Sequence, residues 1–202
     1  MKPIHVGLLG FGTVGQGTWN VLRRNQGEIQ RRAGRPIEIN WIGTRTLDRA
    51  REGTRGIPGV NLTNDPAVVV RHPDVDIVCE LIGGIEPARQ LVLDAIAHGK
   101  HVVTANKALL AHHGTEIFAA AHAKGVMVAF EAAVAGGIPI IKALREGLTA
   151  NRIEWIAGII NGTSNFILSE MRARGASFAT VLAEAQAHGY AEADPTYDIE
   201  GV

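Results

Sequence analysis

The chain has 202 residues, of which 46% are hydrophobic and 20% are charged, and this globular composition excludes an intrinsically disordered protein. Its 20 lysines and arginines balance 20 acidic residues, so we expect no nucleic-acid partner, because neutralising phosphates requires a clustered basic excess. A single cysteine excludes a disulfide framework and, with no signal-peptide pattern at the N-terminus, favours a cytoplasmic location. Residues 126–144 are the longest apolar region, but Glu131, Pro139 and Lys142 interrupt it, so we expect no membrane span.

Strands that alternate with helices are predicted over the first two thirds of the chain. Short apolar runs predict strands at residues 4–9, 37–43, 76–81, 101–104 and 126–130. Helical spacing of apolar residues, with proline or glycine near the ends, predicts helices at residues 13–31, 87–98 and 106–124. Such alternation is typical of a parallel sheet covered by helices on both faces. We therefore predict an α/β fold for residues 1–130, with a doubly wound parallel sheet of the Rossmann type.

The pattern changes after residue 130. A turn-rich stretch at residues 135–139 precedes elements predicted as a helix at 139–148, a strand at 152–160 and helices at 163–174 and 178–188. A single strand is too little sheet for an independent domain. We therefore expect residues 131–202 to form a partial, incomplete α+β region. Its exposed strand edges and apolar faces favour self-association.

A glycine-rich loop follows the first predicted strand and opens the first predicted helix. It matches the dinucleotide-binding pattern G-x-G-x-x-G with the residues Gly10, Phe11, Gly12, Thr13, Val14 and Gly15. In this pattern Gly10 permits a tight turn, Gly12 lets the backbone approach a pyrophosphate, and Gly15 allows close packing of helix on strand. The helix N-terminus then offers free N–H groups and a positive dipole end. We therefore predict an NAD(P)-binding site, with a glycine turn that binds nothing as the alternative.

The end of the second predicted strand indicates which cofactor is used. Enzymes that use NAD carry an acid there, which accepts a hydrogen bond from the ribose 2′-hydroxyl. This strand ends in Thr44-Arg45-Thr46, and the first acid is Asp48. Arg45 could instead bind a 2′-phosphate, which favours NADP over NAD, while a solvated surface arginine remains the alternative.

Lys107 follows the predicted strand at residues 101–104, as the last residue of the sequence Thr104-Ala105-Asn106-Lys107. Ligands of open parallel sheets bind beyond the carboxyl ends of the strands. A partly desolvated lysine at that edge could hold a substrate or assist proton transfer. The alternative is a solvated lysine at a helix start. Cys79 lies inside a predicted strand and is interpreted as a small buried hydrophobic residue rather than a nucleophile.

Four motifs resemble the homoserine dehydrogenase family, in the same order and at similar spacings. They are residues 103–107 (VTANK), 130–139 (FEAAVAGGIP), 161–168 (NGTSNFIL) and 189–195 (GYAEADP). The resemblance covers the chain from the glycine loop to Val202. It implies the NAD(P)-dependent interconversion of L-homoserine and L-aspartate 4-semialdehyde, on the pathway to threonine, methionine and isoleucine. It also implies a homo-oligomer, expected to be a dimer, whose substrate and dimerisation region begins at residue 131.

The resemblance also implies roles for individual residues. The cofactor would be faced by the glycine loop, including Thr13 and Val14, and by Arg45, Thr104, Lys107 and Gly189. Lys107 would be the catalytic residue, between nicotinamide and substrate. Glu192 would bind the substrate, through its ammonium group, with Asp198 in support; a fixed carboxylate suits that charge.

A monovalent cation, sodium or potassium, is a further implication of the resemblance. Its ligands would be backbone oxygens of Glu131, Val134, Gly136 and Ile138. A hard cation prefers oxygen ligands, and a glycine-rich turn exposes carbonyl groups, so the chemistry agrees with the implied site.

The chain departs from the family at its end. Family members continue with an aspartate and, a few residues later, a lysine named as the proton donor, and neither precedes Val202. We therefore expect this chain to bind cofactor but to turn over substrate poorly or not at all. Two other readings stay open: a non-catalytic NADP-binding module, and a related Rossmann reductase that acts on another small acid or aldehyde.

Overall fold

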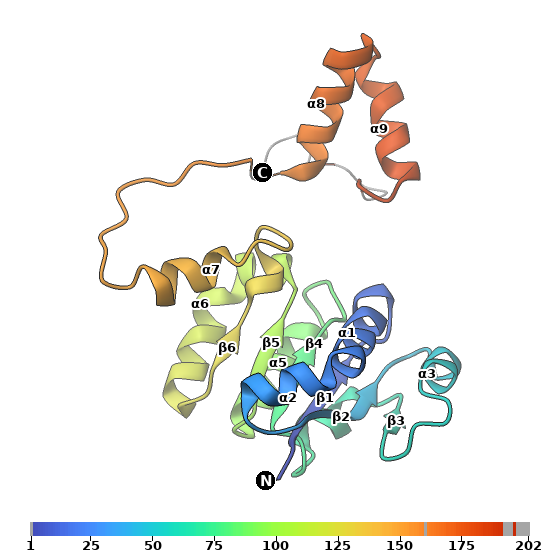
Figure 1. Ribbon diagram of the computed structural model, residues 1–202, viewed down its shortest axis with the longest axis vertical. Coiled ribbons are helices and arrows are strands. Elements are labelled where there is room, and N and C mark those ends of the chain that lie inside the picture. The colour runs from blue at the N-terminus through green and yellow to red at the C-terminus, as the bar shows by residue number, and fades with distance from the viewer. Residues whose placement is uncertain (1, 160, 192–195, 197–202) are drawn as a thin grey trace. The chain divides into compact units, whose positions relative to one another are not determined.

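The computed structural model describes residues 2–159, 161–191 and 196. Contacts divide the chain into two compact units between Thr149 and Ala150, which we call the first and second units (Figure 1). Each unit is described by itself. The domain boundary expected after residue 130 stays a prediction, and residues 131–149 belong by their contacts to the first unit.

A parallel sheet forms the centre of the first unit. Within the described residues it has six strands, in the order β3-β2-β1-β4-β5-β6. Their bounds are Ile4–Leu9 (β1), Ile37–Gly43 (β2), Asn61–Thr63 (β3), Ile77–Glu80 (β4), His101–Thr104 (β5) and Val128–Ala129 (β6). The order reverses between β1 and β4, which lie side by side at the centre. This topology confirms the Rossmann-type fold.

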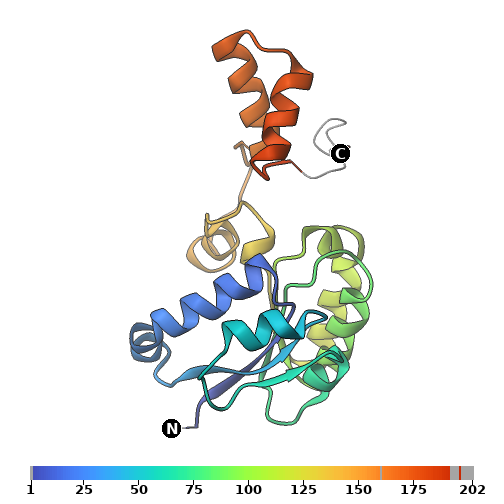
Figure 2. The same cartoon turned by 90° about the vertical axis from the view of Figure 1, so that its right-hand side faces the viewer.

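Helices cover both faces of the sheet, as Figure 2 shows. They are α1 (Thr13–Arg24), α2 (Gln26–Ala33), α3 (Leu47–Gly53), α4 (Pro66–Arg71), α5 (Ala88–Ala97) and α6 (Lys107–Lys124). Alternate strand residues face opposite ways, so Leu8 packs with α1 and α3, while Leu9 packs with α4, α5 and α6. Two buried cores therefore sandwich the sheet and hold the carboxyl ends of its strands at one edge.

Several local predictions for the first 130 residues need correction. The helix expected at residues 13–31 is broken at Asn25 into α1 and α2, where asparagine and the nearby Gly27 are poor helix formers. The strand expected at 126–130 is confined to β6. The short elements α3, β3 and α4 were not predicted. Of these, α4 carried a sequence signal, an aspartate followed by proline, which is typical of a helix start. In the structure Asp65 does cap this helix, since its side chain accepts a hydrogen bond from the Ala67 N–H, 2.9 Å away.

Residues 131–149 form a turn and a short helix against the sheet edge. The elements are η1 (Glu131–Ala133), α7 (Ile140–Lys142) and the π-helical turn η2 (Ala143–Gly147). Of these, α7 and η2 together match the helix expected at residues 139–148. The Glu131 carboxylate accepts hydrogen bonds from the N–H groups of Ile141 and Lys142, both at 2.9 Å.

The second unit is a pair of helices, α8 (Gly162–Arg174) and α9 (Phe178–Ala187), as expected for this region. Ile167, Val181 and Ala185 form its small core. The strand expected at residues 152–160 is wrong for residues 152–159, which form no strand and are exposed. A strand requires a hydrogen-bonded partner, and no described segment pairs with this one.

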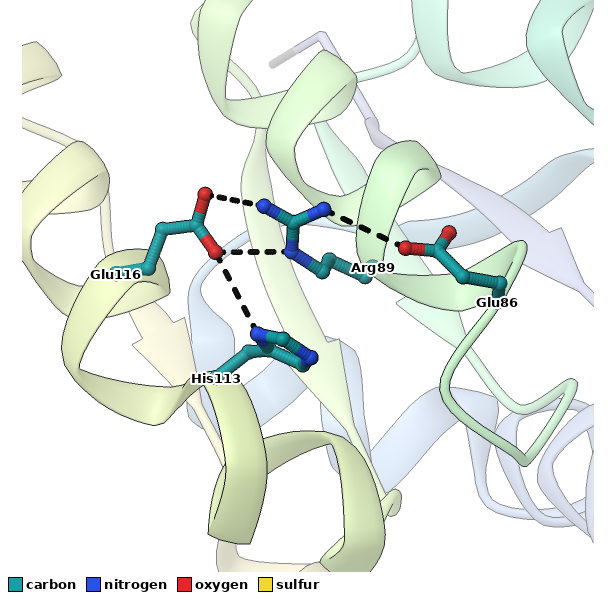
Figure 3. A network of polar contacts seen from close by, with 4 residues as sticks. All are labelled: Glu86, Arg89, His113 and Glu116. Carbon is teal, nitrogen blue, oxygen red and sulfur yellow. Dashed lines mark hydrogen bonds and ion pairs between the residues drawn. The ribbon is translucent and has the colours of Figure 1, made fainter.

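An ion-pair network joins α5 to α6 in the first unit, and Figure 3 shows its four side chains. Arg89 on α5 donates to both carboxylate oxygens of Glu116 on α6, at 2.9 and 2.6 Å. Its third nitrogen lies 3.4 Å from Glu86, and His113 lies 3.6 Å from Glu116. The hydrogen bond with Arg89 holds the pKa of Glu116 below its ordinary value of 4.5.

This network predicts a pH-dependent stability difference. A carboxyl with a lowered pKa in the folded state stabilises the fold above its unfolded pKa and loses that effect as the pH falls through the folded pKa. We therefore expect Arg89→Met to lower the melting temperature at pH 7, and the deficit to shrink below pH 4.5. Arg51→Met, which removes an exposed pair with Asp48, is the control and should change little. Thermal unfolding at pH 7 and pH 3 checks this; a deficit independent of pH would contradict it.

Candidate cofactor-binding site

The glycine loop has the geometry of a pyrophosphate cradle. Gly10 has a φ of +94°, and a Cβ there would lie 2.6 Å from the Leu81 carbonyl oxygen at the end of β4. A Cβ at Gly15 would lie 2.3 Å from the Gly10 carbonyl oxygen, so α1 packs directly on the loop. A Cβ at Gly12 would meet no atom within 4 Å. The turn and the close packing predicted for Gly10 and Gly15 are confirmed, and Gly12 faces open space.

The N-terminus of α1 is open as well. Gly12 is the residue that caps it, and among the described residues no side-chain cap accepts a hydrogen bond from its first turn. Thr13 and Val14 begin the helix and are exposed, while Phe11 is 1% exposed and belongs to the core. Free backbone N–H groups at the positive end of a helix dipole suit a diphosphate. The residues present therefore fit the cofactor that the sequence predicts, although the buried Phe11 offers it almost no surface.

Arg45 lies immediately beyond β2, at the same edge of the sheet, and is exposed. It forms no ion pair within the part of the chain that the structure describes, so its guanidinium group is available to a ligand. The nearest acid along the chain, Asp48, is paired with Arg51 at 2.8 Å. The arrangement suits a 2′-phosphate better than a ribose hydroxyl, which requires a carboxylate.

Thr104 and Lys107 end β5 and begin α6, respectively. Thr104 is 0% exposed, and its hydroxyl donates to the Glu80 carboxylate at 2.7 Å, so in this unit neither its side chain nor its backbone is open to a cofactor, contrary to the cofactor contact that the resemblance implies. Lys107 is exposed at the first position of α6, which corrects the expectation of partial desolvation within this unit. The positive end of a helix dipole disfavours a lysine, so helix stability does not explain Lys107.

Glu80 and Asn106 are polar residues at this edge that the sequence analysis did not select. Glu80 ends β4 and is 0% exposed, and Asn106 caps α6 and is 7% exposed. The signal available was an acid that closes an apolar strand and precedes Gly83-Gly84. Both residues contact Thr104 through hydrogen bonds.

Cys79 is buried in β4, as predicted, and burial raises the pKa of its thiol to about 11. The thiolate is the reactive form, so the folded chain should be inert to thiol reagents. We expect Ellman's reagent at pH 8 to label no thiol in the folded chain and one per chain in guanidinium chloride. Free cysteine is the control for reagent activity. Rapid labelling of the folded chain would contradict the structural role.

The four residues implied as cation ligands lie in one turn, between the start of η1 and α7. Ala135 and Gly136 have φ values of +55° and +58°, so the backbone turns sharply there. The Glu131 carbonyl accepts from the Val134 N–H at 3.2 Å, and that of Ile138 accepts from Ile140 at 2.8 Å. The cation itself stays a prediction. A cavity of about 1000 Å³ lies nearby, along β6, and includes no residue of the glycine loop.

In the second unit, two of the four resembling motifs come together. Asn161 caps α8 by accepting the Ser164 N–H at 2.9 Å, and the neighbouring Thr163 hydroxyl donates to the Tyr190 carbonyl at 2.6 Å. Gly189 precedes Tyr190 and has a φ of +74°. Glu192 and Asp198, the predicted substrate ligands, lie outside the described residues.

None of the helices described is long and apolar enough to cross a membrane.

Comparison with known families divides the chain into two matched stretches. Residues 10–131 match the model described as "Homoserine dehydrogenase, NAD binding domain". Residues 139–202 match the model described as "Homoserine dehydrogenase". The first stretch includes the glycine loop, Arg45 and Lys107, and the second includes α8, α9 and Gly189.

Individual relatives agree with these matches. Homoserine dehydrogenases of Pseudomonas aeruginosa and Neisseria gonorrhoeae are 63% and 61% identical over this whole chain, which spans 46% of each. The crystal structure of a homoserine dehydrogenase from Thiobacillus denitrificans matches 98% of this chain, and 45% of its own, with a TM-score of 0.91 and 71% identity. A hyperthermophilic archaeal homoserine dehydrogenase in complex with NADPH matches 99% of this chain and 66% of its own, at 25% identity and a TM-score of 0.83.

The chain thus spans about half the length of the bacterial relatives that it matches. It covers both matched stretches at high identity, and its six-stranded sheet over the described residues has the topology that the glycine loop requires. The chain therefore belongs to the homoserine dehydrogenase family.

Proposed function

We propose that this protein is an NADP-preferring homoserine dehydrogenase, which interconverts L-homoserine and L-aspartate 4-semialdehyde. The observation that carries the proposal is the open glycine cradle at the carboxyl edge of the sheet, together with Arg45, which follows the neighbouring strand β2 and has no ion pair among the described residues. The NADPH complex of an archaeal relative supports the same cofactor class. The threonine, methionine and isoleucine pathway, a cytoplasmic location and a dimer are parts of the same proposal.

The residues of this chain have separate tasks in the proposal. The N–H groups at the start of α1 hold the diphosphate, and Arg45 holds the 2′-phosphate. The bound nicotinamide supplies the hydride chemistry. Lys107 is the catalytic residue in this proposal, because it begins α6 directly after the carboxyl end of β5, the edge at which ligands of this fold bind. Because Lys107 is exposed in the first unit, bound substrate must provide the desolvation that suits a lysine to proton transfer.

Two further parts of the proposal concern the substrate. Glu192, supported by Asp198, binds the ammonium group of the amino acid, since a carboxylate is its natural partner. Gly189 is a further cofactor-binding residue in this proposal, as the resemblance implies. A sodium or potassium ion is bound by backbone oxygens in the turn at residues 131–138.

The test combines binding with turnover. We expect the 202-residue chain to quench its tryptophan fluorescence on titration with NADPH, and to bind NADH more weakly. L-Homoserine-dependent formation of NADPH is then followed at 340 nm, in this chain and in a fusion to the remaining part of the P. aeruginosa relative, with L-serine as the control substrate. Turnover of L-homoserine by the fusion supports the enzyme. Tight NADPH binding without turnover in either protein would favour a non-catalytic module.

A further inference from the structure

A buried carboxylate lies at the carboxyl end of β4, where the strand order reverses. Glu80 is 0% exposed and forms no ion pair with any residue that the structure describes. One oxygen accepts the N–H groups of Ile82 and Gly83, at 2.8 and 3.2 Å, and the other accepts the Thr104 hydroxyl at 2.7 Å. Burying a carboxyl without an ion pair is costly, so stability alone does not explain this residue.

Thr104 and Asn106 extend these contacts to the next loop. The Thr104 hydroxyl, which donates to Glu80, also accepts the Asn106 N–H at 3.0 Å. The Asn106 side chain donates to the Gly84 carbonyl at 2.6 Å and accepts the N–H of Leu109 at 3.0 Å. The loop after β4 and the start of α6 are therefore joined through Glu80, Thr104 and Asn106. Lys107 is the next residue along the chain.

The position of this hydrogen-bonded group within the fold indicates what it serves. A dinucleotide lies across the reversal point of a Rossmann sheet, with one half on each side. The side formed by β1, β2 and β3 carries the glycine loop and Arg45, which suit the adenosine half. The side formed by β4, β5 and β6 is left for the nicotinamide half, and Glu80 stands at its inner border with β1.

We propose that Glu80 is a positioning residue, which shapes the nicotinamide half of the cleft and fixes the start of α6 on which Lys107 lies. It acts through the backbone of residues 82–84 and through Thr104 and Asn106, and touches no ligand itself. The inference rests on the proposed function, because it requires NADPH to bind at this edge.

Two ligands allow binding to the two halves of the cleft to be measured separately. NADPH occupies both halves, whereas adenosine 2′,5′-bisphosphate lacks the nicotinamide and reports on the adenosine half alone. We expect Glu80→Gln and Thr104→Val each to weaken NADPH binding about tenfold, since each removes a hydrogen bond that involves a charged group. Binding of the bisphosphate should stay within about twofold of the parent. Thr104→Ser keeps the hydroxyl and should restore NADPH affinity.

Thr54→Val is the matched control. The Thr54 hydroxyl is also buried and donates to the Ala50 carbonyl, at 2.8 Å, so the same substitution removes a hydrogen bond elsewhere. It should alter the affinity for neither ligand. If Glu80→Gln does not fold, the two Thr104 variants decide.

Each remaining outcome has a definite meaning. Unchanged NADPH affinity in the variants, or equal losses for both ligands, would overturn the positioning role. A parent chain that binds neither ligand would overturn the proposed function, and the inference with it. If the parent chain binds NADPH and the bisphosphate, and the variants bind both with the same affinities as the parent, the inference alone is overturned.

Discussion

Gly12→Ala is expected to leave the fold intact and to weaken NADPH binding at least tenfold. A Cβ at this position meets no atom of the chain within 4 Å, and φ is −75°, which alanine adopts freely. Exchange of glycine for alanine at a helix cap costs at most about 1 kcal/mol. The added methyl group, however, occupies the space through which the backbone must approach a diphosphate.

Gly15→Ala, unlike Gly12→Ala, is expected to destabilise the fold. Its Cβ would lie 2.3 Å from the carbonyl oxygen of Gly10, and backbone atoms cannot rotate away. Relief requires α1 to move off the loop, which should cost about 3 kcal/mol of folding free energy. Gly17→Ala is the control, since a Cβ there contacts nothing and alanine favours an exposed helix by about 1 kcal/mol.

Urea unfolding and fluorescence titration with NADPH measure the two quantities separately. The expected pattern is a loss of binding without a loss of stability for Gly12→Ala, a loss of stability for Gly15→Ala, and neither for Gly17→Ala. Parent-like NADPH affinity in Gly12→Ala would show that the diphosphate does not lie on this loop.

Arg45→Glu should reverse the choice of cofactor. Loss of a charge-assisted hydrogen bond to phosphate, with a repulsive carboxylate in its place, costs about 3 kcal/mol, or about 100-fold in NADPH affinity. The new carboxylate can accept a hydrogen bond from the ribose 2′-hydroxyl, so NADH binding should hold or improve. Arg24→Glu makes the same charge change at the far end of α1, and should alter the ratio of the two affinities little. A preference for NADPH that survives in Arg45→Glu would exclude Arg45 as the 2′-phosphate ligand.

The sequence was most informative at positions where the backbone conformation or close packing allows few residue types. The positive φ of Gly10 and the tight packing at Gly15 belong to a pattern whose spacing is itself diagnostic, so the first strand, turn and helix could be predicted together. Short apolar runs identified the central strands, and helical spacing of apolar residues identified the helices α5 and α6. The capping signals of Asp65 and Pro66 were available for α4, but six residues are too few for a helical period to show.

Contacts between distant residues were beyond prediction. The apolar alternation at residues 152–159 is compatible with a strand, but strand formation depends on a partner, and a single sequence does not reveal one. Glu80 was hidden for the same reason, because its partner Thr104 is 24 residues away and only the sheet brings them together.

The central place of β1 has a consequence for how the protein is synthesised. This strand is synthesised before both of its neighbours, β2 and β4, and the contact between His5 and Asp76 spans 71 residues. At a translation rate of about 5–20 residues per second, β1 waits about 4–14 s for that neighbour. During this interval the edge of β1 that later pairs with β4 has no strand partner, so during synthesis this apolar edge is exposed to pairing with other chains.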